Sequence, residues 1–508
     1  MGLQPPQPKM TAQTLAVIDI GSNTSRVTVF RMNGDGHYSA VADSRAALQL
    51  LRGLSSGQRS ESEVTASLMA ALRDFQEVAR GAGADRTVAL ATYSFRGYPR
   101  AEELAGRIES EFGIEVKIID GEREAELAFL GAIYGMDVED GLLIDLGGGS
   151  VELALFRKRS VQRSWSLPLG ALLLNDRFLT DDPPSKTQIE QVQAHVSETL
   201  QAAGIRPLKP GERLIATGGT VRNLAKMDRH ERSTPISQIH GYALSRRSIK
   251  ELSRKLAAVP RGTLADYPGL NGDRKESIAA GGLILHSILR HLQAEEVQVS
   301  GQGLREGFAL STYMSQLPPA RTVRKVAIES LAHRFATWEL RAAQRRAGLA
   351  SALLAILDPE AGEDIQECLN HAAWILDIGK SIDYVDRFQH TASVLMATDL
   401  AGFSHRQLAL LAATISAADK RKLDLRGFRP LLSSSDETAL ERAGLVLALA
   451  DEVEKRLPPE HGIPVAFHDA ERAYIGVYLP VPYGGRLATL ADRFPKVFGW
   501  ELRFEGKG

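Results

Sequence analysis

The chain has 508 residues, too many for one hydrophobic core, and its length predicts about three domains. Its formal net charge is −1, so a polyanionic ligand would have to be met by a local basic surface. The single cysteine, Cys368, excludes an intramolecular disulfide and a cysteine-based zinc site, and it fits the reducing cytoplasm, where we expect the protein. No apolar run approaches the roughly 20 residues that cross a bilayer, so we expect a soluble protein without a membrane partner.

The predicted elements divide the chain into five segments. Residues 1–14 have no basic or long apolar region and are predicted to be a disordered leader. Strand patterns such as TLAVIDIG and TVALAT alternate with helical patterns over residues 15–129, and a similar alternation over 130–313 predicts a second α/β domain. Leu317-Pro318-Pro319 then marks a change to long helical patterns over 321–457. Residues 458–508 regain strand character and are predicted to form a small α+β unit.

One segment of the chain occurs twice without a gap. Residues 17–30 read VIDIGSNTSRVTVF, and residues 143–156 read LIDLGGGSVELALF. Each copy predicts an apolar strand that ends in an aspartate, Asp19 or Asp145, then a turn of small residues and a second strand. Backbone N–H groups of such turns can converge on an anion, and the aspartate can hold a metal or a water. Two of these turns facing each other would grip a phosphate.

Other residues strengthen or qualify this prediction. A third turn of small residues follows an apolar strand at 217–220, although turns at strand ends often contain glycine for structural reasons alone. Arg26 and Glu152 occupy the same place in the two copies, and they offer a phosphate clamp and a carboxylate for a metal or water. Arg96 follows a strand and is either a ligand to phosphate or a surface arginine. The acids of the segment 120–126 either favour a helix N-terminus or include a general base.

The helical region carries basic clusters that have two interpretations. Arg334, Arg341 and Arg345 share one helical face with Arg346 beside them, and Lys420, Arg421 and Lys422 form another cluster. Such charges are usually solvated, but a protein with phosphate turns could use them as a binding track for a polyanion.

These motifs resemble one enzyme family. DIGSNTSRV, IIDGEREAELAF, LLIDLGGGSVEL, IATGGT and VSGQGLREG are similar, in order and spacing, to motifs of the exopolyphosphatase and guanosine pentaphosphate phosphohydrolase (Ppx/GppA) family. The resemblance implies an α/β fold of duplicated actin-like domains of the acetate and sugar kinase, Hsp70 and actin superfamily (ASKHA, ribonuclease H-like). An all-α HD-like domain and a small α+β unit would follow, as in the long form of the family.

The resemblance also implies roles for particular residues. Glu124 matches the family's catalytic base and Glu152 its second acid. Magnesium is the usual metal, with Asp145 and Glu152 as the candidates to hold it, and a monovalent cation such as K⁺ is a further possible cofactor. The residues that map to the substrate phosphate pocket are Asn23, Thr24, Ser25, Arg26, Arg96, Gly147, Gly148, Gly149, Ser150, Gly218, Gly219 and Thr220.

The helical region departs from true HD phosphohydrolases. Where those enzymes place a His-Asp pair, this chain has Leu376-Asp377, and leucine cannot bind a metal. His371 and His390 flank the position without restoring the pair. We therefore expect no second metal centre, and a domain that guides substrate or forms a homodimer.

The function expected from the resemblance is magnesium-dependent, processive release of orthophosphate from the end of inorganic polyphosphate. Hydrolysis of the guanosine pentaphosphate pppGpp is the alternative with the same machinery, and pppGpp or ppGpp could act as substrate or inhibitor. A kinase of the same superfamily and a non-catalytic protein that senses alarmones or phosphate are more distant alternatives. No specific nucleic acid is expected as a partner.

Overall fold

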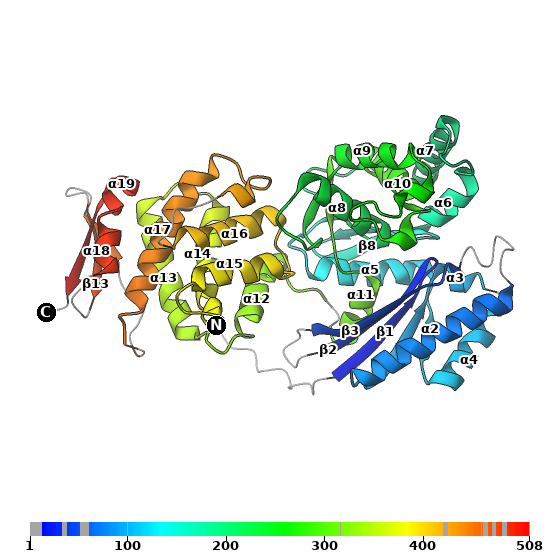
Figure 1. Cartoon of the computed structure of the whole chain (residues 1–508), viewed down its shortest axis with the longest axis horizontal. Coiled ribbons are helices and arrows are strands. Elements are labelled where there is room, and N and C mark those ends of the chain that lie inside the picture. Colours follow the sequence, from blue (N-terminus) through cyan, green and yellow to red (C-terminus); the bar gives the residue numbers. More distant parts are fainter. Residues whose placement is uncertain are drawn as a thin grey trace. The chain divides into compact units, whose positions relative to one another are not determined.

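The computed structural model describes residues 13–32, 38–50, 60–98, 100–314, 316–419, 425–458, 460, 466–469, 474–479 and 485–506. They form two compact units (Figure 1). Unit 1 comprises residues 1–231 and 239–320, and unit 2 comprises residues 232–238 and 321–508. The predicted leader lies outside the described residues except for Gln13 and Thr14, which belong to the first strand. Among the described helices, none is both long enough and apolar enough to cross a membrane.

Unit 1 contains two mixed sheets of similar topology. The first has the strand order β3-β2-β1-β4-β5 and the second has the order β10-β11-β9-β6-β7-β8. In each sheet a three-stranded antiparallel meander continues into parallel strands, β1 to β4 and β6 to β9. The strands of the first sheet are β1 (Gln13–Ile20), β2 (Thr24–Met32), β3 (Tyr38–Ala47), β4 (Arg86–Ala91) and β5 (Glu115–Ile118). The strands of the second are β6 (Gly141–Leu146), β7 (Val151–Arg157), β8 (Ser160–Leu167), β9 (Arg213–Thr217), β10 (Tyr242–Ser245) and β11 (Glu296–Val299).

The sequence repeat corresponds to two hairpins with the same register. Asp19 lies opposite Arg26 in the hairpin β1–β2, and Asp145 lies opposite Glu152 in the hairpin β6–β7. Both second strands are also irregular at equivalent places, 29–30 in β2 and 155–156 in β7, where their pairing with the third strand shifts. The predicted hairpins are therefore confirmed, and the duplication extends beyond the repeated letters to the whole meander.

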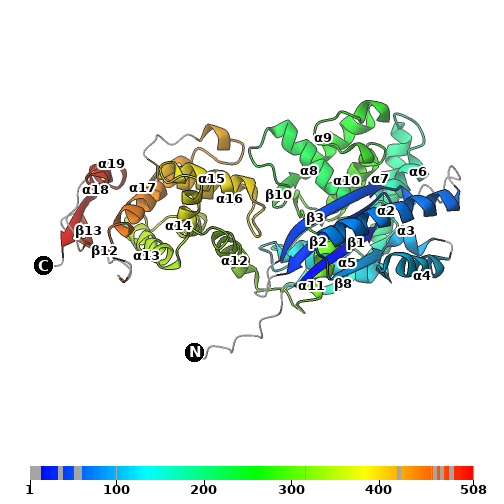
Figure 2. The same ribbon diagram turned by 60° about the horizontal axis from the view of Figure 1, so that its bottom comes forward.

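Helices cover both faces of the sheets, and α5 packs against both sheets. Apolar side chains of β1 and β2 pack against α2 and α4 on one face and against α5 and α11 on the other. The second sheet packs against α6 to α10 on one face and against α5 on the other. Figures 1 and 2 show α5 and α11 between the two sheets. The helices of unit 1 are α2 (Glu61–Gly81), α3 (Tyr93–Arg96), α4 (Ala101–Phe112), α5 (Gly121–Tyr134), α6 (Ala171–Phe178), α7 (Lys186–Ala202), α8 (Gly219–Arg232), α9 (Arg246–Ala257), α10 (Ile278–His291) and α11 (Leu304–Ser311).

Unit 2 is mainly helical and ends in a three-stranded sheet of order β12-β13-β14. The sheet and its two helices contribute Ile475, Val477 and Phe494 to the same hydrophobic core as the long helices, so the C-terminal segment is packed onto the helical region. The elements are α12 (Ala320–Ala332), α13 (Leu340–Leu357), α14 (Glu363–Ile375), α15 (Arg387–Ala397), α16 (His405–Ala417), α17 (Asp436–Glu454), β12 (Ala466–Asp469), β13 (Tyr474–Leu479), α18 (Arg486–Ala491), α19 (Phe494–Phe498) and β14 (Glu501–Gly506).

The predicted basic face of the helical region is wrong for two of its arginines. Arg345 on α13 is buried and forms an ion pair with Glu454 at 2.5 Å. Arg346 is fully buried between Asp377 at 2.7 Å and Asp451 at 3.2 Å. Burial alone would raise the pKa of Asp451, but the charges of Arg346, Lys455 and Arg387 hold it at about 2. A buried guanidinium needs such partners, so these arginines serve the core of unit 2.

The other members of the predicted basic clusters have different outcomes. Arg334 and Arg341 are exposed. Lys420, Arg421 and Lys422 lie outside the described residues. A polyanion track in unit 2 therefore keeps only Arg334 and Arg341 among the described members of those clusters.

Candidate active site

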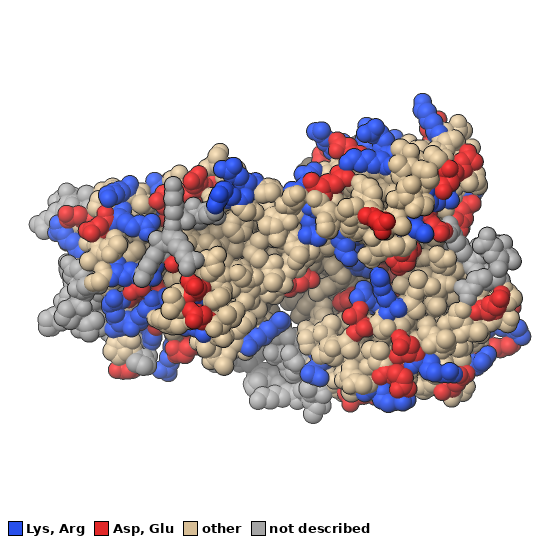
Figure 3. All heavy atoms as spheres, in the orientation of Figure 1, with Lys and Arg blue, Asp and Glu red and all other residues tan. Residues whose placement is uncertain are grey.

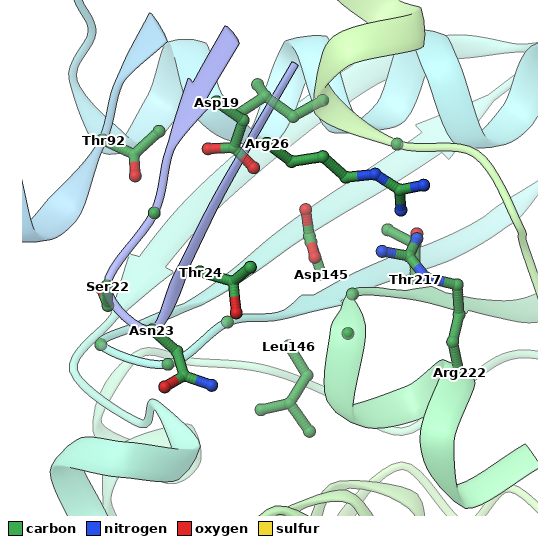
Figure 4. A pocket seen from close by; sticks show the side chains of 18 of the residues that line it. Asp19, Ser22, Asn23, Thr24, Arg26, Thr92, Asp145, Leu146, Thr217 and Arg222 are labelled. Atoms are coloured by element: carbon green, nitrogen blue, oxygen red, sulfur yellow. The ribbon is translucent and has the colours of Figure 1, made fainter. Parts of the chain in front are cut away.

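A polar cavity of about 200 Å³ lies within unit 1, between the turns of the two repeated hairpins. The β1–β2 turn, the β6–β7 turn and the β9–α8 turn line it, together with the first turns of α5 and α11. Figure 4 shows Asp19 and Asp145 beside this space, with the guanidinium groups of Arg26 and Arg222 extending toward each other. The three turns predicted from the sequence therefore meet at one site.

Six acidic side chains line the cavity, and four of them, Asp19, Glu124, Asp145 and Glu152, have raised pKa values. Asp19 and Asp145 lie near the ends of β1 and β6, Glu152 is opposite Asp145 on β7, and Glu124 is in the first turn of α5. Burial raises the pKa of all four. The pKa of Asp145 reaches about 6, and the pKa of Glu152 reaches about 7 because the charge of Asp145 adds to burial. These acids are therefore poised to exchange protons or to accept a cation near neutral pH.

The position of Glu124 follows from the start of its helix. Asp120 caps α5 by accepting a hydrogen bond from the Arg123 backbone N–H at 2.8 Å, so the helix begins where the sequence predicts. The Arg96 guanidinium donates to Glu124 Oε2 at 3.0 Å and also to the Ile119 carbonyl oxygen. Burial and the charge of Glu152 raise the pKa of Glu124 well above its usual range, and Arg96 opposes this shift. Arg96 thus holds the carboxylate in place and stabilises its charged form.

Arginines line the cavity together with these acids; Arg305 is buried, and Arg222 and Arg274 are half-buried. Arg222 of α8 donates to Thr217 Oγ1 at 3.4 Å and to the Gly301 carbonyl oxygen at 3.3 Å. Burial, with the nearby charge of Arg305, lowers the pKa of Arg222 to about 10. Arg305 Nη1 is buried without a hydrogen-bond partner. Burial also lowers the pKa of Arg274. An unsatisfied guanidinium nitrogen beside further arginines in a polar cavity indicates a site for a small anion.

The glycines of the turns allow close backbone approach. A Cβ atom on Gly149 would lie 2.3 Å from a ring carbon of Tyr93, and one on Gly170 would lie 2.2 Å from the Gly149 backbone. Gly218 has φ +100°, a left-handed conformation that favours glycine, and a Cβ there would lie 2.4 Å from the Leu146 carbonyl oxygen. The turns are thus packed together so that their backbones form the wall of the cavity.

The predicted substrate-binding residues have different places in the structure. Three of them do not line the cavity: Ser25 and Thr220 are fully buried, and Arg96 lies behind Glu124. Asn23 Nδ2 donates to the Asp273 carbonyl oxygen at 3.0 Å, and Thr24 Oγ1 donates to Asp273 Oδ2 at 3.1 Å, so both link the two halves of unit 1. The predicted residues that line the cavity are Asn23, Thr24, Arg26, Glu124, Asp145, Gly147, Gly148, Gly149, Ser150, Glu152, Gly218 and Gly219.

The sequence prediction missed several charged residues of the lining. Arg222 follows Gly218 by one helical turn, and Arg305 with Glu306 follows Gly303 at the start of α11. A basic residue up to four positions after a glycine-containing turn is a sequence signal that could have identified both Arg222 and Arg305. Lys226 lies two helical turns after Gly218 on α8, while Arg45, Asp273 and Arg274 come from elements without such a turn before them, and the fold brings all four to the cavity.

Asp145 and Glu152 have the chemistry that a magnesium ion requires. Both are oxygen donors at paired positions of β6 and β7, Glu152 buried and Asp145 half-buried, and the charge of Asp145 disfavours ionisation of Glu152 unless a cation is added. Ser166 Oγ donates to Glu152 Oε1 at 2.8 Å and orients it. Among the described residues, no three His, Cys, Asp or Glu side chains converge as a closed metal site. Magnesium commonly uses only one or two carboxylates with waters and phosphate oxygens, so this donor set fits.

Comparisons with known proteins identify relatives of unit 1. Exopolyphosphatase 1 of Mycobacterium tuberculosis is 28% identical over 300 residues, which cover 58% of this chain and 87% of the relative. The crystal structure of an exopolyphosphatase from Cytophaga hutchinsonii is 26% identical, with a TM-score of 0.54, and the match covers 59% of this chain and 99% of that one. The Aquifex aeolicus Ppx/GppA enzyme is 26% identical with a TM-score of 0.52, covering 59% and 100%. These structures confirm the predicted actin-like α/β fold class.

Family models cover both units of the chain. The model of the Ppx/GppA phosphatase family matches residues 28–316, more than half of the chain, and the model of domain III of that family matches residues 323–456. The first match spans every residue of the cavity lining from Arg45 onward, and the second spans the helical part of unit 2. The repeated hairpins, the site between them and these matches show that the chain belongs to the Ppx/GppA phosphatase family and is a phosphatase, a hydrolase.

Proposed function

We propose that this enzyme is an exopolyphosphatase, which hydrolyses the terminal phosphoanhydride bond of inorganic polyphosphate and releases orthophosphate. The observation that carries the proposal is the cavity of unit 1, which brings carboxylates, including the buried Glu124 and Glu152, together with the arginines Arg222, Arg274 and Arg305. The names of the M. tuberculosis and C. hutchinsonii relatives support polyphosphate as the substrate.

The arginines and the glycine turns would bind the terminal phosphoryl group. Its charge matches Arg222 and Arg305, which lack carboxylate partners at ion-pair distance in the described part of the chain. Backbone N–H groups of turns 147–150 and 218–219, which also line the cavity, add their dipoles. Phosphoryl transfer needs little covalent help, so positioning and charge neutralisation supply most of the rate enhancement.

Glu124 is the general base in this proposal. It is the acid of the first turn of α5 that is both buried and part of the cavity lining. Its raised pKa makes its carboxylate a stronger base toward a water that attacks the phosphorus atom in line with the leaving oxygen. Arg96 is a positioning residue, since it touches Glu124 and does not line the cavity.

Asp145 and Glu152 would hold magnesium, which when bound neutralises charge on the phosphate oxygens and relieves the repulsion between the two acids. Asp19 adds a third carboxylate with a raised pKa on the side of the first sheet. A monovalent cation and a homodimer remain parts of the proposal that rest on the family resemblance.

The polar lining favours a phosphate chain over a nucleotide. Beside its charged and small polar residues, the cavity presents Tyr93, Leu146 and Leu304 as its large apolar side chains. A guanine base is usually seated on aromatic or apolar surface, whereas successive phosphates need cations and N–H groups.

Phosphate release from long polyphosphate, short polyphosphate and pppGpp, measured side by side with magnesium, tests the proposal. We expect a higher kcat/KM on polyphosphate than on pppGpp. A clear preference for pppGpp would assign the same site to the alarmone and overturn the substrate proposed here.

A further inference from the structure

Two cations from opposite sides of the cavity have no acidic partner. Arg45 is on β3 of the first sheet, and Lys226 is on α8 beside the second sheet. Both line the cavity. Within the described part of the chain, neither side chain forms a hydrogen bond or an ion pair.

Arg45 lies beside another arginine. It is the direct cross-strand neighbour of Arg26 on β2, and Arg26 also lines the cavity. Like charges directly opposite each other on adjacent strands destabilise a sheet. Arg26 is partly neutralised by Asp43 at 2.6 Å, but Arg45 is not. An anion bound between the side chains of Arg26 and Arg45 would offset their repulsion and so explain why the two arginines lie opposite each other.

Lys226 is surrounded by the same group of cations. It stands one helical turn after Arg222, and Arg229 follows it at the next turn of α8. Burial lowers the pKa of Lys226, and the charges of Arg222, Arg45, Arg26 and Arg229 lower it further. The basic group therefore continues from Arg222 near the acids to Lys226 and Arg45. In Figure 3, Lys and Arg side chains gather on the part of unit 1 between α8 and the strands β2 and β3.

We propose that Arg45 and Lys226 form a second phosphate-binding station, which holds the phosphoryl groups that follow the terminal one in a long polyphosphate chain. The inference rests on the proposed function and deepens it, because the station makes affinity depend on chain length. Arg222 and Arg305 would bind the terminal phosphate, and the chain would continue between Arg45 on one side and Lys226 on the other. A linear polyanion that contacts both stations binds through connected contacts, which raises its affinity above that of a single phosphate.

The experiment compares the Arg45→Gln/Lys226→Gln double variant with the parent chain. The readouts are the Michaelis constant for long polyphosphate and the inhibition constant of orthophosphate, which probes the terminal site alone. We expect the Michaelis constant to rise by roughly tenfold or more, because two charge-assisted contacts are lost. The inhibition constant should change much less. The charge-conserving Arg45→Lys/Lys226→Arg variant should recover most of the affinity for long chains.

A matched control uses α9. Lys250→Gln/Arg254→Gln removes the same charge from two exposed residues of unit 1 outside the cavity lining, and it should leave the Michaelis constant unchanged. An equal loss in this control, or an equal change in both readouts of the test variant, would overturn the station.

Binding separates this inference from the proposed function. Calorimetric titration of long polyphosphate into the Glu124→Gln variant, with and without the Arg45 and Lys226 substitutions, requires no turnover. If the parent chain does not hydrolyse polyphosphate but binds it through these two residues, the station stands and the proposed function fails. If it hydrolyses polyphosphate but the substitutions leave binding of long chains unchanged, the station fails and the proposed function stands.

Discussion

The acids at the start of α5 have the same chemistry but different surroundings. Glu122 and Glu126 are exposed, whereas Glu124 is buried and lines the cavity. We therefore predict that Glu124→Gln lowers kcat by about two to four orders of magnitude, the usual contribution of a general base, while the melting temperature stays near that of the parent. Glu122→Gln is the matched control and should keep full turnover. The reverse result, a loss of turnover in Glu122→Gln alone, would show that Glu122 and not Glu124 is the general base.

Arg96 acts on the reaction through Glu124. We predict that Arg96→Gln lowers kcat more than it raises the Michaelis constant, because the variant loses the hydrogen bond that holds Glu124 but no contact with the cavity. The acidic limb of the pH profile of kcat should also move to higher pH, since Arg96 lowers the pKa of Glu124. Arg96→Lys should restore part of both properties. A variant that changes only the Michaelis constant would favour direct phosphate binding by Arg96, as the family resemblance implies.

The buried acids also predict how stability depends on pH. Folding raises the pKa of Asp145 from 3.8 to about 6 and the pKa of Glu152 from 4.5 to about 7. Between about pH 4 and about pH 7 the folded state therefore binds more protons than the unfolded state. The free energy of unfolding falls as pH rises through this range and levels off above about pH 7. We expect the melting temperature in chelator to follow this course, and magnesium to raise it most at pH 7 and above. Asp145→Asn and Glu152→Gln should flatten the curve. A melting temperature that rises steadily over this range in chelator would contradict the assignment.

At the level of elements, the crossing of α5 and α11 determines the geometry of the site. Glu124 lies in the first turn of α5, Arg305 lies in the first turn of α11, and the two helices meet at Gly131 and Gly307. A Cβ atom on Gly307 would lie 1.7 Å from the Leu127 carbonyl oxygen, so the helices cannot pack this closely with any side chain there. We predict that Gly307→Ala lowers both the melting temperature and kcat, because the helices and their catalytic side chains must separate.

Gly106 on α4 provides the control for that prediction. It is an exposed helical glycine with nothing near the position of an added Cβ, so Gly106→Ala should stabilise the protein by about 0.5–1 kcal/mol without affecting kcat. If Gly307→Ala behaves like Gly106→Ala in thermal denaturation and activity assays, close packing of the two helices is not required.

The arrangement of the elements explains which parts of the fold and of the site could be predicted from the sequence. The hairpins were predictable because strand, turn and aspartate are adjacent in the chain and occur twice, and the register of Asp19 and Asp145 followed from the alignment. Lys226 and Arg274 could not be found in this way, because they reach the cavity from α8 and from the loop before α10, far from either hairpin in sequence. Arg346 shows the opposite difficulty. Its residue type suggested an exposed face, but its position on α13 points it at Asp377 and Asp451 in the core.

For the whole molecule, the division into two units separates the chemistry from the helical region. Every residue that lines the cavity belongs to unit 1, which also has its own hydrophobic cores. The C. hutchinsonii exopolyphosphatase matches 59% of this chain over 99% of its own length, so a protein of about the extent of unit 1 folds by itself. Residues 232–238 are the exception to a simple boundary, because they belong to unit 2 and Ile236 is buried in the core of that unit.

We therefore predict that a chain ending at residue 320, with Ile236→Ser to avoid exposing an apolar side chain, folds and hydrolyses polyphosphate. The full-length Ile236→Ser variant is needed beside it, because that substitution alone should destabilise unit 2. The shortened chain should also keep its preference for long polyphosphate, because Arg45 and Lys226 are part of unit 1. Loss of affinity for long chains alone would instead place a binding track in unit 2, through Arg334 and Arg341 or the cluster 420–422. Michaelis constants across a series of chain lengths, compared between the shortened and full chains, distinguish the two locations. If the shortened and full chains have equal Michaelis constants at every polyphosphate length, the cavity of unit 1 recognises chain length, and unit 2 has a role outside substrate binding.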